Sequence, residues 1–163
     1  MNDNIGMNYC APDANVWAVN LDGRYMSAVQ NYLAADGIPA DGVTKIISNA
    51  AQTLSYCPDP EGIGKCQKTG IVIGKVQSGK TSFFISAMAL AFDNGYNLVY
   101  VIGGTKNKLK NQNYDRLCAN FANNDKISII DITKDDHDNI KEMIGKGKKV
   151  ILVALKNTSE STN

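Results

Sequence analysis

The residues with the clearest potential for chemistry form the stretch GKVQSGKT, residues 74–81. Two glycines flank four residues and precede a lysine and a threonine, which is the spacing of a phosphate-binding loop. In such a loop the glycines let main-chain N–H groups converge on phosphate oxygens. The lysine contacts the β- and γ-phosphates, and the hydroxyl group ligates magnesium. The stretch therefore predicts a site for ATP and Mg²⁺.

Within this loop the side chains expected to take part in the chemistry are those of Lys80, as the source of positive charge, and Thr81, as the magnesium ligand. The other residues expected to contact the nucleotide are Gly74, Val76, Gln77, Ser78 and Gly79. A side-chain contact from Gln77 to the nucleotide and a surface position for it are equally open. A helix is expected to start directly after the loop, and its N-terminus adds a partial positive charge.

The elements that must position this loop alternate between short apolar runs and helical stretches from residue 70 onward. Alternating strands and helices with continuously apolar strands predict an α/β fold with a mostly parallel sheet flanked by helices. The expected strands are 70–74, 98–104, 127–132 and 148–155. The expected helices between them are 81–95, about 106–123 and 135–145. The loop would thus lie between the first strand and the first helix.

The part of the chain before the loop has a different pattern. Apolar residues at helical spacing predict helices at 24–35 and 41–56, and Pro58 and Pro60 end the second one. We therefore expect a partly helical N-terminal extension, residues 1–68, followed by an incomplete phosphate-loop NTPase lobe, residues 69–163. The sequence stops just after the last expected strand, which suggests a fragment of a larger protein.

Composition and net charge exclude few classes of protein. The chain has 163 residues with 44% hydrophobic content, enough for a buried core, and its net charge of +1 argues neither for nor against a nucleic-acid partner. Four widely spaced cysteines and a single histidine make a zinc site an unfavoured reading. No signal peptide and no apolar run of membrane-spanning length is visible, so a soluble, cytoplasmic protein is expected.

Three short patterns carry a resemblance that goes beyond the loop. They are V-Q-S-G-K-T at 76–81, A-x-D-x-G-Y at 91–96, and G-x-x-x-x-L-K-x-Q-x-x-x-R at 104–116. Together with the surrounding elements over about residues 40–157, the chain resembles helicase-like ATPases of superfamily 2. It is most similar to bacterial proteins that carry a Z-one domain behind an ATPase core.

This resemblance implies the RecA-like first lobe of a DNA-dependent ATPase of a restriction or phage-defence system, with further lobes as its partners. It also implies that the segment after the second strand contacts the DNA backbone, with Thr105, Lys106, Lys108, Lys110 and Gln112 as candidate contacts. Lysines at the start of a helix are suited to phosphate contacts. The alternative, in which KNKLKNQ is a solvated helix face around Leu109, stays open.

Hydrolysis needs more than the loop, and the sequence contains no Asp-Glu pair that could serve as the second acidic motif. Asp131, after the apolar run ISII, is the one competitor, and it would make the chain a complete small phosphotransferase. The acidic cluster at 135–138 is better explained as helix capping than as a metal site. A non-enzymatic interaction domain with a degenerate loop is the third possibility.

Overall fold

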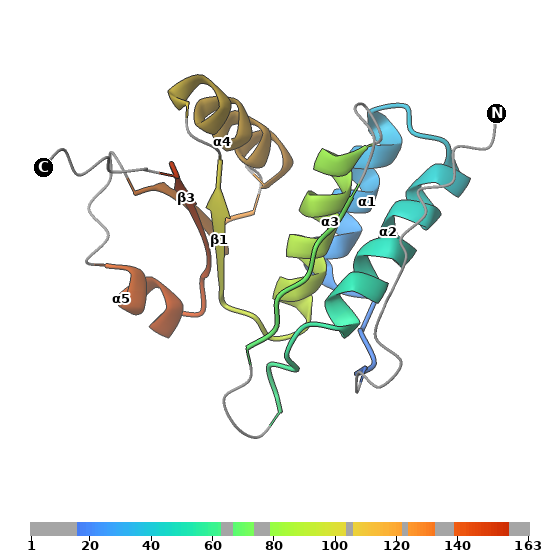
Figure 1. Ribbon diagram of the computed structural model, residues 1–163, viewed down its shortest axis with the longest axis horizontal. Helices are drawn as coiled ribbons and strands as arrows, with labels where there is room; N and C mark the ends of the chain where they lie inside the picture. The colour runs from blue at the N-terminus through green and yellow to red at the C-terminus, as the bar shows by residue number, and fades with distance from the viewer. Residues whose placement is uncertain are drawn as a thin grey trace, which may run out of the picture. The chain divides into compact units, whose positions relative to one another are not determined.

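The computed structural model describes residues 16–62, 67–73, 79–103, 106–121, 124–132 and 139–156. The chain divides into two compact units, Met1–Gly95 and Tyr96–Asn163. The first unit is helical in its described part and the second is an α/β unit (Figure 1). The chain is therefore α/β with a small parallel sheet flanked by helices.

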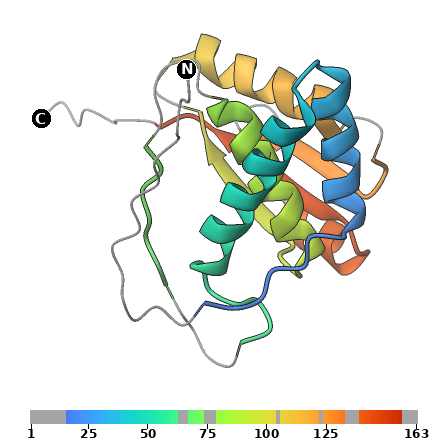
Figure 2. The same ribbon diagram turned by 90° about the vertical axis from the view of Figure 1, so that its right-hand side faces the viewer.

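Three helices lie side by side in the first unit (Figure 2): α1 (Arg24–Ala35), α2 (Ala40–Ser55) and α3 (Lys80–Asp93). Helix α3 contacts both of the others. Most of its residues are apolar and its buried positions extend around more than one face, which is typical of a helix packed on several sides. Tyr25 of α1 meets Phe92 of α3 edge to face, with 5.8 Å between the ring centroids.

The start of α1 is capped by a side chain from α3. One carboxylate oxygen of Asp93 accepts a hydrogen bond from the Tyr25 N–H at 3.0 Å, and the other accepts from the Met26 N–H at 2.7 Å. These are two of the amides that a helix start leaves without intrahelical partners. Gly23, the residue before α1, lies so close that a Cβ on it would be 1.9 Å from Asp93 Cγ. Only glycine fits there.

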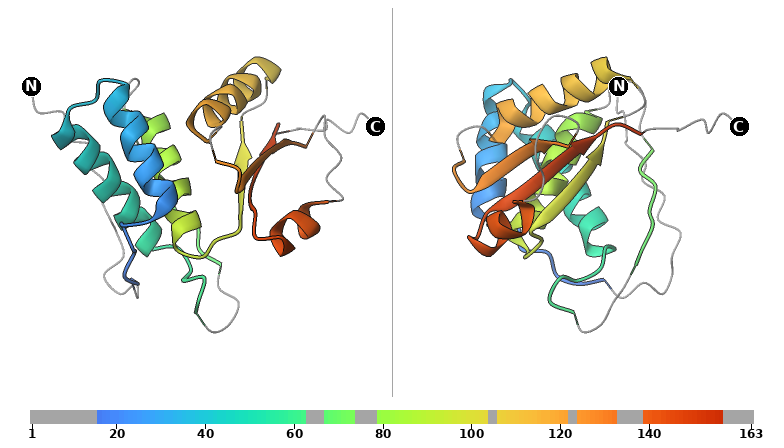
Figure 3. Two further views of the ribbon diagram at one scale, coloured as in Figure 1. Left: turned by 180° about the vertical axis from the view of Figure 1, so that it is seen from behind. Right: turned by 90° about the vertical axis from the view of Figure 1, so that its left-hand side faces the viewer.

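The second unit contains a three-stranded parallel sheet in the order β1-β3-β2 (Figure 3). Its elements along the chain are β1 (Leu98–Ile102), α4 (Asn107–Phe121), β2 (Ile127–Asp131), α5 (Ile140–Gly145) and β3 (Lys149–Ala154). The crossover from β1 to β2 and the return to β3 run in opposite directions. Right-handed connections then place α4 and α5 on opposite faces of the sheet, as the figures show (Figures 1 and 3).

The pairing register assigns the strand residues to these faces. Val150 and Leu152 pack with Ile130, and the apolar residues of α5 cover them: Ile140, Met143 and Ile144. The residues of β1 aligned with this side, Leu98, Tyr100 and Ile102, are exposed, because α5 is short and contacts β3. Helix α4 covers the other face, where Ile151 and Val153 are fully buried.

Most predicted elements are confirmed within a few residues at each end, but the strand predicted at 70–74 is wrong over its described part. Residues 70–73 are not in a strand, and Ile71 and Ile73 are 84% and 74% exposed. A parallel strand is held by ladder hydrogen bonds to a neighbour, and no described strand pairs with this segment. The start of the helix predicted at 135 lies outside the described residues.

The two compact units divide after Gly95, just past the end of α3. The reason is that α3 packs against α1 and α2 in the first unit. Within the described part of the chain, no helix is both long and apolar enough to cross a membrane.

Candidate functional site

The described end of the predicted phosphate loop is the turn into α3. Gly79 has a left-handed backbone (φ 74°, ψ 19°) and is followed at once by Lys80, the first residue of α3. The carbonyl of Gly79 accepts the first helical hydrogen bond, from the Phe83 N–H at 3.0 Å. Residues with a Cβ rarely adopt this conformation, so the turn explains why a glycine stands here. Lys80 and Thr81 therefore lie in the first turn of the helix.

Two observations bear on whether this turn fits an anionic group. The cap residue of α3 is Gly79, which has no side chain of its own to cap the helix, and the N-terminus of a helix carries a partial positive charge. A Cβ placed on Gly79 would meet no described atom within 4 Å, so the space beside it is open. The turn therefore fits the end of a phosphate cradle. Four predicted loop residues lie outside the described residues: Gly74, Val76, Gln77 and Ser78.

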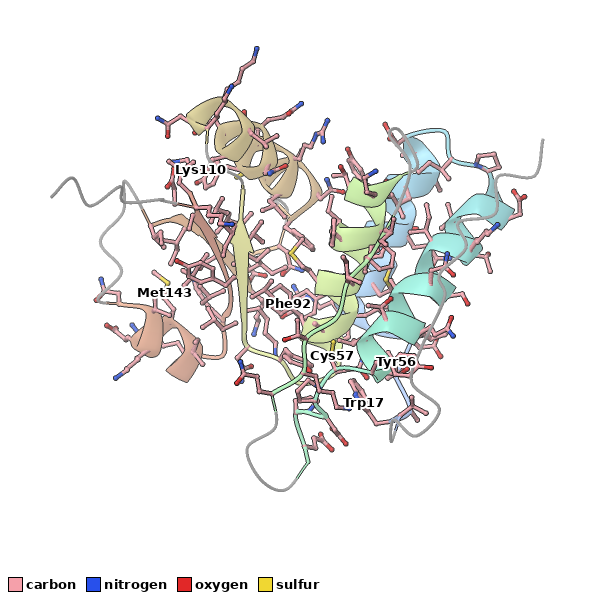
Figure 4. The ribbon with its side chains drawn as sticks, in the orientation of Figure 1. Trp17, Tyr56, Cys57, Phe92, Lys110 and Met143 are labelled. Carbon is pink, nitrogen blue, oxygen red and sulfur yellow. The ribbon has the colours of Figure 1, made fainter. Side chains whose placement is uncertain are left out.

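A second group of residues meets at the carboxyl ends of the strands in the second unit. Lys110, in the first turn of α4, reaches Asp131 at the end of β2, with 2.5 Å between Nζ and Oδ2. Both residues are buried, at 2% and 3% exposure. Gly103, just after β1, donates a hydrogen bond to the Ala154 carbonyl at 2.8 Å. All three strand ends and the start of α4 are thus connected. Lys110 is labelled in Figure 4.

Gly103 is also the point where α4 approaches the sheet most closely. A Cβ on Gly103 would lie 2.9 Å from the Lys110 Cα, closer than real Cβ atoms come. The missing side chain lets the first turn of α4 lie directly against the end of β1. The strand end and the buried ion pair therefore fix the same helical turn from two sides.

The position of Lys110 corrects one prediction. It was expected among the DNA contacts, but its ammonium group is buried and bound to Asp131. In this conformation it cannot reach a phosphate in solvent. Leu109, around which the open alternative placed a solvated helix face, is 47% exposed. The first turn of α4 therefore has Lys110 inside and Leu109 outside, because the carboxylate at the end of β2 pairs with Lys110.

The same ion pair bears on the role of Asp131. A magnesium-binding carboxylate needs an oxygen available to the cation. One oxygen of Asp131 instead accepts from the Lys110 ammonium in a buried setting. The geometry therefore gives no support to Asp131 as the magnesium acid of a complete phosphotransferase.

The remaining candidates for nucleic-acid contact are on the surface of α4 and just before it. Lys106, Lys108 and Gln112 are exposed. A shallow depression along the helix is lined by Lys108, Asn111, Gln112, Asp115, Arg116 and Ala119. Thr105 lies outside the described residues. The structure thus leaves two lysines and an amide exposed on α4 and directly before it.

Sequence reasoning missed the role of Asp93. Asp93 belongs to the A-x-D-x-G-Y pattern, and its carboxylate caps α1 at amides that lie 67 and 68 residues earlier in the chain. Asn94, the next residue, exchanges hydrogen bonds with the backbone of Asn20 at 2.7 and 2.9 Å. The sequence places Asp22-Gly23 directly before α1. Because the cap residue Gly23 has no side chain, a capping group from elsewhere in the chain could have been expected.

The described part of the chain offers little other chemistry. Cys57 and Cys118 are free thiols, and burial raises the pKa of the Cys57 thiol, an effect that the nearby Lys68 reduces. No group of three His, Cys, Asp or Glu side chains among the described residues could hold a metal ion.

Comparison of the chain with protein-family models, with curated proteins and with solved structures found no match.

Proposed function

We propose that residues 74–81 bind a nucleoside triphosphate with magnesium, with ATP as the expected ligand. The observation that carries this proposal is the turn at Gly79, whose left-handed backbone leads directly into α3 at Lys80. A glycine with this backbone, a helix that starts directly after it and the G-x-x-x-x-G-K-T spacing supply the parts of a phosphate cradle.

Each residue of the first turn has a distinct role in this proposal. The Lys80 ammonium group binds the β- and γ-phosphate oxygens, and the Thr81 hydroxyl oxygen is the protein ligand for the cation. The first-turn amides of α3 donate to phosphate oxygens and add the partial charge of the helix end. Magnesium, when bound, neutralises phosphate charge.

The wider proposal is that the chain belongs to a phosphate-loop ATPase lobe of the helicase-like, Z-one-associated type, with DNA contact through the start of α4. What supports the contact is the exposure of Lys106, Lys108 and Gln112 on that segment, with Thr105 preceding them in the sequence. Lys110 is left out because it is buried. Since the sequence has no Asp-Glu pair, we propose nucleotide binding by this chain with little or no turnover.

Calorimetry and thermal denaturation with ATP and Mg²⁺ test the nucleotide site. A ligand at 100 times its Kd stabilises the folded state by about 2.7 kcal/mol. We expect this stabilisation in the wild type and in Lys126→Ala, whose exposed lysine lies far along the chain. We expect it to be lost in Lys80→Ala and weakened in Thr81→Ala.

Three results would contradict parts of the proposal. Equal stabilisation of the wild type and Lys80→Ala would mean that the nucleotide binds elsewhere. No stabilisation of the wild type at millimolar ATP and Mg²⁺ would favour the interaction-domain alternative, in which the loop is degenerate. Robust ATP turnover that is abolished by changing Asp131 would overturn the assignment of that residue to the ion pair.

A further inference from the structure

The buried pair of Lys110 and Asp131 connects the start of α4 to the end of β2. We propose that these two are positioning residues: their ion pair fixes the first turn of α4 so that Lys106 and Lys108 present their ammonium groups to the phosphate backbone of DNA. This inference rests on the DNA contact in the proposed function, and it assigns to the pair a purpose other than binding.

The geometry of the first turn links the buried lysine to the exposed ones. The Lys110 N–H donates to the Lys106 carbonyl at 3.2 Å, and the Leu109 N–H donates to the same carbonyl at 3.1 Å. Lys106 and Lys110 are thus one helical turn apart and share a backbone hydrogen bond. Moving Lys110 relative to the sheet would move Lys106 with it.

The charges in this turn divide into two sets. The ammonium group of Lys110 is neutralised by Asp131 inside the protein. The ammonium groups of Lys106 and Lys108 remain on the surface. A DNA backbone approaching this turn would therefore contact Lys106 and Lys108. The buried pair would affect DNA binding only by fixing the position of the turn that carries these two lysines.

A buried ion pair is a weak explanation of stability by itself. Removing two charges from water is unfavourable, and well-packed apolar residues of similar volume often replace such a pair without loss. An ion pair has a directional geometry that an apolar contact lacks, because the ammonium group must meet the carboxylate at hydrogen-bonding distance. Such a pair can therefore fix the orientation of a helix start.

The test is a charge-neutral double replacement, Lys110→Met with Asp131→Leu, which removes one positive and one negative charge together. The matched control is Lys146→Met with Glu142→Leu, which removes the exposed pair of α5 and is also charge-neutral. Binding of a fluorescently labelled oligothymidylate is measured over a series of salt concentrations, and amide hydrogen exchange is followed in α4.

We expect the control to bind as the wild type does. We expect the Lys110/Asp131 double variant to keep a melting temperature close to that of the wild type and to bind about tenfold more weakly. Its salt dependence should be shallower by about one phosphate contact, because the exposed lysines no longer reach the backbone together. Amide protection in the first turns of α4 should fall. A purely structural role would leave the salt dependence unchanged.

The outcomes separate this inference from the function on which it rests. If the wild type does not bind DNA, the proposed contact is wrong and so is the purpose given to the pair. If the wild type binds and the double variant has the same affinity and salt dependence, the positioning role alone is refuted. Should the double variant not fold, Gly103→Ala is the second variant, because its methyl group would displace the same turn without a change in charge. Unchanged DNA binding by Gly103→Ala would equally overturn the inference.

Discussion

Replacing Asp93 by alanine removes both hydrogen bonds that hold the start of α1. The carboxylate accepts from the Tyr25 and Met26 amides at 3.0 and 2.7 Å. A helix cap contributes about 1 kcal/mol, and a carboxylate at a helix N-terminus adds up to about 1 kcal/mol more. We expect Asp93→Ala to lower the free energy of unfolding by about 2 kcal/mol. In a domain of this size that corresponds to a fall of roughly 4–8 °C in Tm.

The closeness of Gly23 to Asp93 makes a second and sharper prediction possible. A methyl group on Gly23 would lie 1.9 Å from Asp93 Cγ and 2.3 Å from its Cβ. Gly23→Ala therefore forces the carboxylate away from the amides that it caps, and we expect a loss of about 2 kcal/mol, the scale of a lost cap with added strain. In an Asp93→Gly background the methyl group has no side chain to meet, so the same change should cost only a few tenths of a kcal/mol.

Urea denaturation followed by far-UV circular dichroism measures these free energies, and amide exchange in α1 locates the effect. Asp36→Ala is the control, because Asp36 is an exposed acid at the opposite end of α1 and its loss should change stability by less than about 0.5 kcal/mol. An Asp93→Ala variant as stable as the wild type would refute the capping argument. An equal cost of Gly23→Ala in both backgrounds would refute the steric one.

Three further changes have expected outcomes. Ser86→Ala should raise the free energy of unfolding by about 0.5–1 kcal/mol in chemical denaturation, because the buried Ser86 hydroxyl has no hydrogen-bond partner among the described residues. Gly79→Ala should cost about 1 kcal/mol, since its φ of 74° suits glycine, and should weaken ATP binding in calorimetry. The neutral Cys57 thiol is favoured in the folded state by burial, which raises its pKa. Its contribution to stability should thus be complete below the ordinary thiol pKa of about 8.5 and fall as the pH rises above it, a decline that Cys57→Ala should lack.

The helices and most strands were predictable because each carries its own periodicity. The stripe of Val43, Ala50 and Leu54 on α2 is buried as the spacing indicates. The continuous apolar run of β3 is likewise buried throughout its length. Residues 70–73 and 149–154 are both rich in isoleucine and valine, yet only the second segment forms a strand, because a strand also requires a neighbour to pair with.

The interactions between distant residues were not predictable from the same patterns. The first turn of α4 reads as a polar helix start around Leu109, but Asp131 lies 21 residues further along and draws Lys110 inward. Asp93 and the amides that it caps are 67 and 68 residues apart. A periodicity reports which side of an element is apolar, and it does not report which polar group meets another across the fold.

The strand β1 ends the sheet of the described residues on one side, and its five residues carry no charge. Its outward side chains Leu98, Tyr100 and Ile102 are also exposed. Natural sheets usually protect such an edge strand with lysine, proline or a bulge, and none of these interrupts LVYVI. Concentrated preparations of this chain are therefore expected to self-associate through the β1 edge, and a lysine in place of Tyr100 should keep them monomeric.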